Sequence, residues 1–112
     1  MRQLRLDKRT IIKKSREFDR IFTDGHKKSS EHILLLFLES PQIKIGFSVS
    51  KKIKGAVKRN RAKRRLREIV RLNQHKLPDK QAYIFFAKPG VEKFDFSKLQ
   101  TELLILIEKI RQ

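Results

Sequence analysis

The sequence predicts an α+β or α/β fold, a two-layer sandwich in which three helices pack on a small mixed sheet. Three segments carry apolar residues at helical spacing, and three shorter segments carry strand patterns. They follow the order helix, strand, strand, helix, strand, helix. The length of 112 residues suits one domain, so residues 1–112 are expected to form a single unit.

The first helix is expected to follow a basic N-terminal arm, residues 1–14, that packs irregularly. Ser15 is a suitable N-cap, and Gly25 predicts a C-terminal stop in the left-handed conformation. Between them, three apolar residues stand at i, i+3 and i+4: Phe18, Ile21 and Phe22. Residues 26–31 are polar and predict a loop.

Two strands are expected next. The apolar run at residues 32–38 is short enough for a strand that is buried on both faces. Ser40 and Pro41 indicate a turn. From residue 43 to residue 50, apolar side chains alternate with lysine, glycine and serine, which is the period of a strand with one apolar and one small polar face. These two strands are therefore expected to form a hairpin.

The segment Ala56–Asn73 predicts a helix that is apolar on one narrow stripe and strongly basic elsewhere. The stripe consists of Ala62, Leu66, Ile69 and Val70. The cationic residues are Lys58, Arg59, Arg61, Lys63, Arg64, Arg65, Arg67 and Arg71. Like charges one turn apart destabilise a helix, and a run of charge is often only a solvated face. This density of arginine instead favours phosphate, to which the planar guanidinium donates two parallel hydrogen bonds.

The last strand and the last helix complete the fold. Pro78 is expected to end the basic segment, and residues 81–88 predict a strand. Both faces of this strand are apolar, which indicates a central position in the sheet. After a Pro-Gly break, a helix is expected to begin near Ser97, because Ser97 and Gln100 have the spacing of a capping box. Its buried stripe is Leu99, Leu103, Leu106, Ile107 and Ile110.

The charge balance indicates a polyanionic partner. There are 29 Lys and Arg residues against 12 Asp and Glu, a formal net charge of +17. Self-repulsion of this size opposes folding, so the candidate partners are nucleic acid and an anionic membrane surface, ahead of an acidic protein. With no cysteine there is no disulfide framework and no thiolate metal site. No apolar run is long enough for a signal peptide or a membrane span, so we expect a cytoplasmic protein with no membrane partner.

A motif at the start of the basic helix is the most specific signal. Its residues are Arg59, Asn60, Arg61, Lys63 and Arg64. It stands within the stretch GFSVSKKIKGAVKRNRAKRRLRE at residues 46–68. Upstream, residues 18–25 read FDRIFTDG, with two Phe four apart and a terminal Gly. This combination resembles the ribonuclease P protein family, and the resemblance covers nearly the whole chain.

The resemblance implies an RNA-binding subunit of an endoribonuclease in which a catalytic RNA removes the 5′ leader from precursor tRNA. It also implies a left-handed βαβ crossover through the basic helix and a monomer within the complex. The contacts with the catalytic RNA carry over to Arg59, Asn60, Arg61, Lys63, Arg64 and Arg67. A cleft for the single-stranded leader carries over to Phe18, Phe22, Ser48, Ser50, Lys51 and Lys52.

The chemistry of the cleft residues agrees with this role. Unpaired bases stack on aromatic rings with little sequence preference, which suits a leader of any sequence. Small polar residues such as Ser48 leave room for nucleotides. By periodicity alone, Phe18 and Phe22 are more typical of a helix core, and one ring can serve both roles. The family often has an aromatic residue on the first strand where this chain has Leu36, which removes one possible stacking platform.

Neither a catalytic site nor a metal site is predicted on the protein. His26, His32 and His75 are dispersed, and the sequence has no paired carboxylates, phosphate loop or nucleophile set. We therefore expect no cofactor on the protein alone, with Mg²⁺ held mainly by RNA in the holoenzyme. The alternatives are a ribosomal or general RNA-binding protein, a DNA-binding module, and an autonomous nuclease, for which the catalytic residues are missing.

Overall fold

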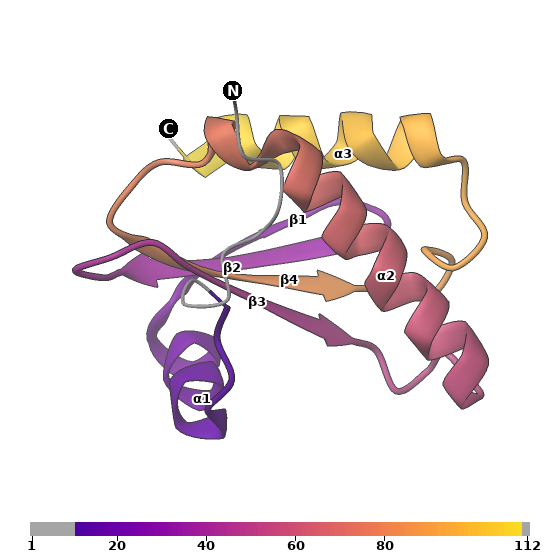
Figure 1. The fold of residues 1–112 in the computed structure, drawn as a ribbon, viewed down its shortest axis with the longest axis horizontal. Coiled ribbons are helices and arrows are strands. Elements are labelled where there is room, and N and C mark those ends of the chain that lie inside the picture. Colours follow the sequence, from indigo (N-terminus) through magenta and orange to yellow (C-terminus); the bar gives the residue numbers. More distant parts are fainter. Residues whose placement is uncertain (1–10, 111–112) are drawn as a thin grey trace.

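The computed structural model describes residues 11–110, in which helices pack on one sheet (Figure 1). In chain order the elements are α1 (Ser15–Asp24), β1 (His26–Ser29), β2 (Ile33–Glu39), β3 (Lys44–Val49), α2 (Ala56–Asn73), the 3-10 turn η1 (Gln74–Lys76), β4 (Gln81–Ala87) and α3 (Phe96–Ile110). The predicted order of helices and strands is confirmed, with β1 as an additional strand. Most of the predicted N-terminal arm, residues 1–10, lies outside the described residues.

The sheet is mixed and has the strand order β1-β2-β4-β3. β2 runs antiparallel to both β1 and β4, whereas β3 runs parallel to β4. The central position predicted for β4 is confirmed. The predicted hairpin of β2 and β3 is wrong, because β4 is apolar on both faces and lies between these two strands. The connection from β3 through α2 to β4 is the expected crossover, and its left-handed sense stays a prediction.

β1 falls in a segment that the sequence predicted to be a polar loop. It pairs with β2, so that Ser29 lies opposite Leu34. As an edge strand with no apolar residue of its own, it carries no strand periodicity that a sequence pattern could reveal. At the opposite edge, Ile11 forms a bridge with Ile45 of β3, and the N–H of Ile12 donates to Ile45 O at 2.8 Å.

Helices cover the two faces of the sheet unequally. α2 and α3 lie together on one face, while α1 lies alone on the other (Figure 1). The main core joins the predicted stripes of α2 and α3 to the sheet and includes Tyr83 and Phe85. A smaller core under α1 contains Ile21, Leu36 and Ile84. The helices therefore form a layer on each side of the sheet, where the sequence predicted one layer.

The ends of α1 differ from the prediction. Lys14, not Ser15, stands at the N-cap position, and no side chain caps the helix. Gly25 follows α1 in the extended conformation, at φ −78°, and not in a left-handed turn. Close packing explains this glycine, because a Cβ there would lie 2.5 Å from Ile21 O and 2.9 Å from Phe37 O.

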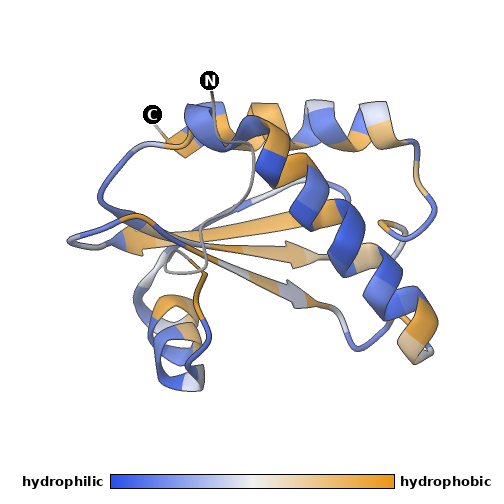
Figure 2. Cartoon of the chain, viewed as in Figure 1, coloured by the Kyte–Doolittle hydropathy of each residue, from blue (hydrophilic) through white to orange (hydrophobic). Residues whose placement is uncertain are grey.

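The bounds of α2 are those predicted, Ala56–Asn73, whereas α3 begins one residue earlier than expected. Oδ1 of Asp95 accepts a hydrogen bond from the N–H of Lys98 at 3.1 Å, so Asp95 makes the capping contact predicted for Ser97. Figure 2 shows β2 and β4 as mostly hydrophobic and α2 as mostly hydrophilic. Within residues 11–110 no helix is long and apolar enough to cross a membrane.

Candidate nucleic-acid interface

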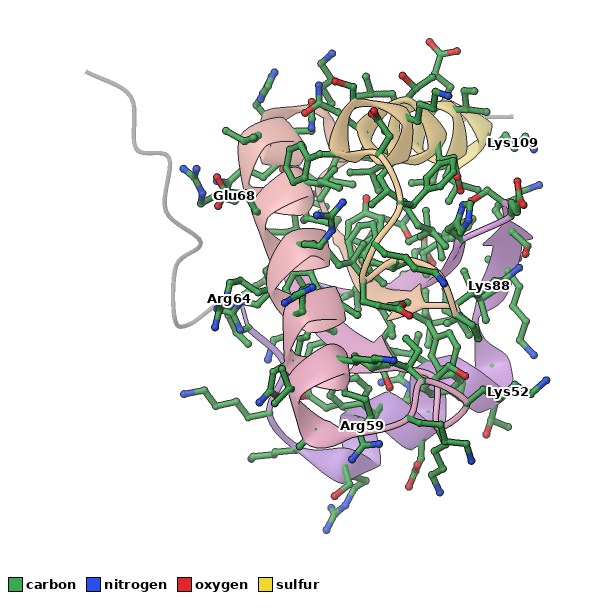
Figure 3. All side chains as sticks on the ribbon, turned by 90° about the vertical axis from the view of Figure 1, so that its right-hand side faces the viewer. Lys52, Arg59, Arg64, Glu68, Lys88 and Lys109 are labelled. Atoms are coloured by element: carbon green, nitrogen blue, oxygen red, sulfur yellow. The ribbon has the colours of Figure 1, made fainter. Side chains whose placement is uncertain are left out.

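The N-terminal half of α2 forms an exposed basic surface. The helix follows Gly55, which has a φ of 89° and no side-chain capping bond. Because the first turn holds no acidic residue, the positive end of the helix dipole adds to the side-chain charge. Figure 3 shows Arg59 and Arg64 along this helix. All six residues assigned to the catalytic RNA are exposed: Arg59, Asn60, Arg61, Lys63, Arg64 and Arg67.

A buried anchor fixes the start of this helix. Ile53 is buried in the turn between β3 and α2, and its N–H donates to Ser50 O at 3.2 Å. Arg59 Nη1 donates to the carbonyl of Ile53 at 3.1 Å. This bond uses one of the five N–H donors of the guanidinium, so the remaining donors can reach a phosphate.

The C-terminal half of α2 carries its own counter-charge. Glu68 accepts a hydrogen bond from Arg71 Nε at 3.0 Å, which lowers the pKa of Glu68 and raises that of Arg71. No ion pair joins Arg59, Arg61 or Arg64 to another residue in the described part of the chain. Most of the uncompensated positive charge of α2 therefore lies in its N-terminal half.

Two arginines of α2 contact aromatic rings. The guanidinium of Arg67 lies 5.4 Å from the ring centroid of Phe47 in β3, while its side chain stays exposed. Arg65 is half-buried, donates to the carbonyl of Phe94 and lies 5.7 Å from the ring centroid of Phe96. Arg65 therefore holds α2 against the segment that leads into α3, and it was not among the predicted RNA contacts.

A second surface lies beside α1, on the other face of the sheet. Phe18 and Phe22 are partly exposed and pack against the small core, so part of each ring is buried and part is open. The Phe18 ring lies over Gly46, where an added Cβ would come within 2.8 Å of its Cζ. Leu36 is fully buried in the small core, so this position contributes packing and no exposed ring.

The turn after β3 supplies the polar part of this surface. Ser48 is partly exposed, whereas Ser50 is buried and its Oγ accepts the N–H of Lys52 at 3.1 Å. Ser50 thus shapes the turn, on which Lys51 and Lys52 are exposed. All the residues assigned to the leader cleft except Ser50 are at least partly open to solvent.

Phe86 and Leu34 extend this surface, and neither was predicted from the sequence to belong to it. In the strand register Phe86 lies between Ser48 and Leu34, and all three side chains are partly exposed. Alternation along residues 81–88 does place Phe86 on the same face as Ile84. The missing information was that the ten residues of α1 cover only part of that face.

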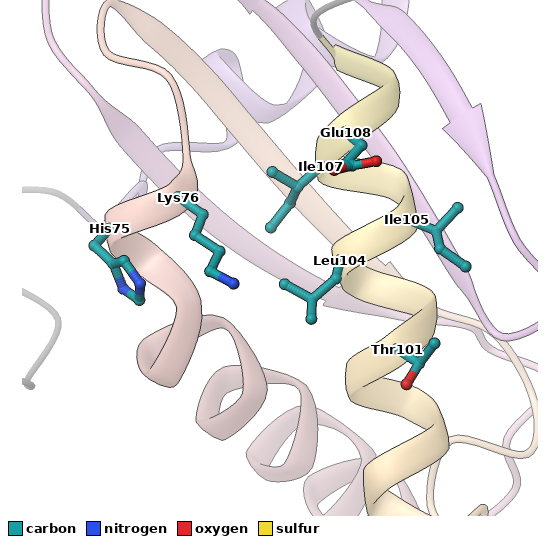
Figure 4. Close-up of a pocket in the computed structure, with 7 residues that line it drawn as sticks. All are labelled: His75, Lys76, Thr101, Leu104, Ile105, Ile107 and Glu108. Atoms are coloured by element: carbon teal, nitrogen blue, oxygen red, sulfur yellow. The ribbon is translucent and has the colours of Figure 1, made fainter.

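The hollow between η1 and α3 lies at the C-terminal end of α2, outside the basic surface (Figure 4). His75 and Lys76 line it on one side, and Leu104, Ile105 and Glu108 line it on the other. Its mixture of charges gives it no preference for an anion. In the described part of the chain, no group of three or more His, Asp or Glu side chains is placed to hold a metal ion.

These surfaces define the class of the molecule: a small, basic α/β protein whose arginine-rich helix is open to phosphate groups. The chain belongs to the ribonuclease P protein family, since the family model described as Ribonuclease P matches residues 6–111. The ribonuclease P protein component of Pelotomaculum thermopropionicum is 33% identical over 101 residues, which cover 88% of this chain and 90% of the relative. That of Natranaerobius thermophilus is 36% identical over 100 residues, with 88% and 87% covered.

Solved structures of this family have the same fold. A mutant of the Staphylococcus aureus RNase P protein superposes with a TM-score of 0.81 at 25% identity, covering 93% of this chain and 90% of that chain. The RNase P protein from Thermotoga maritima superposes with a TM-score of 0.78 at 26% identity, with 88% and 94% covered. Family membership makes the chain a protein component of an endoribonuclease and a partner of ribonuclease P RNA.

Proposed function

We propose that this chain binds the catalytic RNA through α2 and the 5′ leader of precursor tRNA beside α1, as a monomer within the complex. The observation that carries the proposal is the N-terminal half of α2. There Arg59, Arg61 and Arg64 are exposed and have no carboxylate partner among the described residues. Such an arrangement costs repulsion in the free protein and favours a polyanion.

The phosphate groups of a folded RNA suit this half of α2. Arginine can donate two parallel hydrogen bonds to one phosphate, and a helix N-terminus adds free N–H groups and a positive dipole end. The RNA backbone can approach closely at Gly55, because an added Cβ there would meet no atom within 4 Å. If about six phosphates are neutralised, affinity falls by roughly three orders of magnitude between 50 and 200 mM salt.

The surface beside α1 suits a single strand of variable sequence. The open parts of Phe18 and Phe22 offer stacking worth about 1–3 kcal/mol per base, with little preference among bases. Ser48 offers a small polar floor, and Lys51 and Lys52 bring positive charge to its rim. Binding of this kind holds the leader without reading its sequence.

The role that we assign to the protein is to bind and orient, while the RNA performs the cleavage. The sequence contains no nucleophile with an adjacent base and no paired carboxylates, so no residue is assigned to catalysis. Magnesium belongs to the RNA in this proposal, because phosphate and water oxygens are its preferred ligands.

Cleavage of a 5′-extended precursor tRNA by a bacterial ribonuclease P RNA, at low magnesium, tests the proposal. Adding the protein should restore cleavage at the mature 5′ end, and the protein alone should be inactive. A variant with Arg61→Ala and Arg64→Ala should need a higher protein concentration for the same rate. If the protein binds RNA but never stimulates this cut, it is a general or ribosomal RNA-binding protein. If the protein alone cuts the precursor, the assignment of cleavage to the RNA is wrong.

A further inference from the structure

One row of residues on the α1 face stays open across the sheet. In the strand register this row runs from β3 to β1 through Ser48, Phe86, Leu34 and Ser29. None of these four side chains is buried. In the neighbouring row, Ile84 and Leu36 are fully buried in the small core beneath α1. The helix α1 therefore covers one row and leaves the next one open to solvent.

Phe86 is the aromatic residue of this row. Phe18, Phe22 and Leu34 pack against the small core, but Phe86 is packed against neither core. Within the described residues, no aromatic ring contacts it. A large apolar ring that is partly open in the middle of a sheet, with no ring neighbour, is placed to stack on a planar group from another molecule.

Basic side chains stand near both ends of the open row. At the β3 end, the turn exposes Lys51 and Lys52. Near the β1 end, Lys27 is exposed on the same face, opposite Leu36 and two residues before Ser29. Lys88 donates to the carbonyl of Ser30 at 2.7 Å, which ties the turn between β1 and β2 to the end of β4. A ring flanked by separated cations suits a base flanked by phosphates.

The length of the row suits a short single strand. Neighbouring strands lie about 4.8 Å apart, so a row across all of them spans roughly 14 Å, which accommodates a few nucleotides. We propose that the leader of precursor tRNA crosses the sheet along this row, with one base stacked on Phe86 and a phosphate bound by Lys27. This inference rests on the proposed function. It gives the chain a stacking ring on β4, where Leu36 of β2 offers none.

The experiment compares Phe86→Leu with the wild type in the holoenzyme assembled with ribonuclease P RNA. Dissociation constants are measured for precursor tRNA with a long leader, with a leader too short to reach Phe86, and for mature tRNA. Affinity for the long-leader precursor should fall about 5- to 140-fold, the equivalent of one stacked base. Affinity for the other two RNAs should not change. Phe96→Leu is the matched control, because Phe96 is also partly buried but belongs to α3.

A second measurement does not depend on this variant being folded. In the wild-type holoenzyme, 2-aminopurine at one leader position should lose fluorescence by stacking, and Phe86→Trp should keep that quenching. Quenching at no leader position overturns the proposal. So does wild-type affinity of folded Phe86→Leu for the long-leader precursor, or an equal loss for mature tRNA.

The contact with Lys27 has its own readout. Lys27→Ala should reduce the salt slope of long-leader binding by about 0.7, the value of one phosphate contact on a single strand. Lys98→Ala, an exposed lysine of α3, should leave this slope unchanged. An unchanged slope in Lys27→Ala overturns this contact. If wild-type protein affects neither precursor affinity nor cleavage, the proposed function itself fails, and this inference fails with it.

Discussion

Replacing Arg61 and Arg64 with alanine tests the basic surface of α2 most directly. Both side chains are exposed, and neither forms an ion pair within the described residues. Surface substitutions of this kind usually change the free energy of unfolding by less than about 0.5 kcal/mol. The double variant should therefore stay folded, and its loss of binding can be assigned to the interface.

The magnitude follows from counterion release. Each phosphate contact contributes about 0.9 to the slope of log affinity against log salt on a duplex, and about 0.7 on a single strand. Two lost contacts should lower the slope by roughly 1.4–1.8, so the affinity ratio of wild type to variant shrinks about tenfold between 50 and 200 mM salt. Fluorescence anisotropy of labelled ribonuclease P RNA at several salt concentrations measures this.

The matched control for this experiment is Arg65→Ala. Arg65 lies in the same helix but points to the carbonyl of Phe94 and the ring of Phe96. Its loss should leave the salt slope of the folded protein unchanged. Parallel salt slopes for the wild type and the double variant would refute the assignment of this surface to RNA.

Three further changes test the packing that positions these surfaces. Arg65→Ala should lower the free energy of unfolding by about 1–3 kcal/mol, measured by urea titration, because the partly buried carbonyl of Phe94 loses its donor. Gly46→Ala places a Cβ 2.8 Å from Cζ of Phe18 in α1 and should cost about 1–3 kcal/mol of stability, seen as a lower melting temperature. An unchanged melting temperature would show that the Phe18 ring moves aside freely. Burial raises the pKa of Glu102, but hydrogen bonds from Ser30 and His32 outweigh burial, and the net pKa is lowered. The stability from Glu102 is therefore present above about pH 4.3, the pKa of an unfolded Glu, and is lost as pH falls through the lower folded value. Glu102→Gln should cost about 1–3 kcal/mol at neutral pH and progressively less in acid; a pH-independent difference would contradict this.

The basic helix could be predicted from sequence because its information is local. The apolar stripe and the arginine motif occupy one continuous segment, and the observed bounds, Ala56–Asn73, are the predicted ones. The same holds for β4, whose two apolar faces require cover from both sides. In both elements, the local pattern of apolar and charged side chains is enough to predict which faces are buried.

Strand pairing and helix ends could not be predicted because they depend on distant residues. Ser40 and Pro41 indicate a turn, but they do not indicate which strands pair. In the structure β4 lies between β2 and β3, the two strands that this turn joins. Gly25 matches a left-handed stop in sequence, yet the constraint on it is the nearby carbonyl of Phe37, which belongs to another element. The capping role predicted for Ser97 falls to Asp95, which offers equally suitable chemistry.

The residues of the surface beside α1 could also be predicted only in part, because their exposure depends on distant residues. Periodicity predicted that Phe18 and Phe22 share a helix face, and the structure places that face partly in a core and partly in solvent. The family resemblance at Leu36 concerns one position of β2 and cannot reveal a ring on a different strand. Only the register places Phe86 beside Ser48.

The arginines of α2 fall into two groups, those that bond to another part of the protein and those that do not among the described residues. Arg71 has Glu68 and Arg65 has the carbonyl of Phe94, so these two stabilise the protein itself. Arg61 and Arg64 have no such partner among the described residues and add only repulsion to the free molecule. A polyanion that binds only the folded state relieves this repulsion and raises the apparent stability by mass action. Under the proposed function, the residues that weaken the isolated protein are thus those that couple its folding to RNA binding.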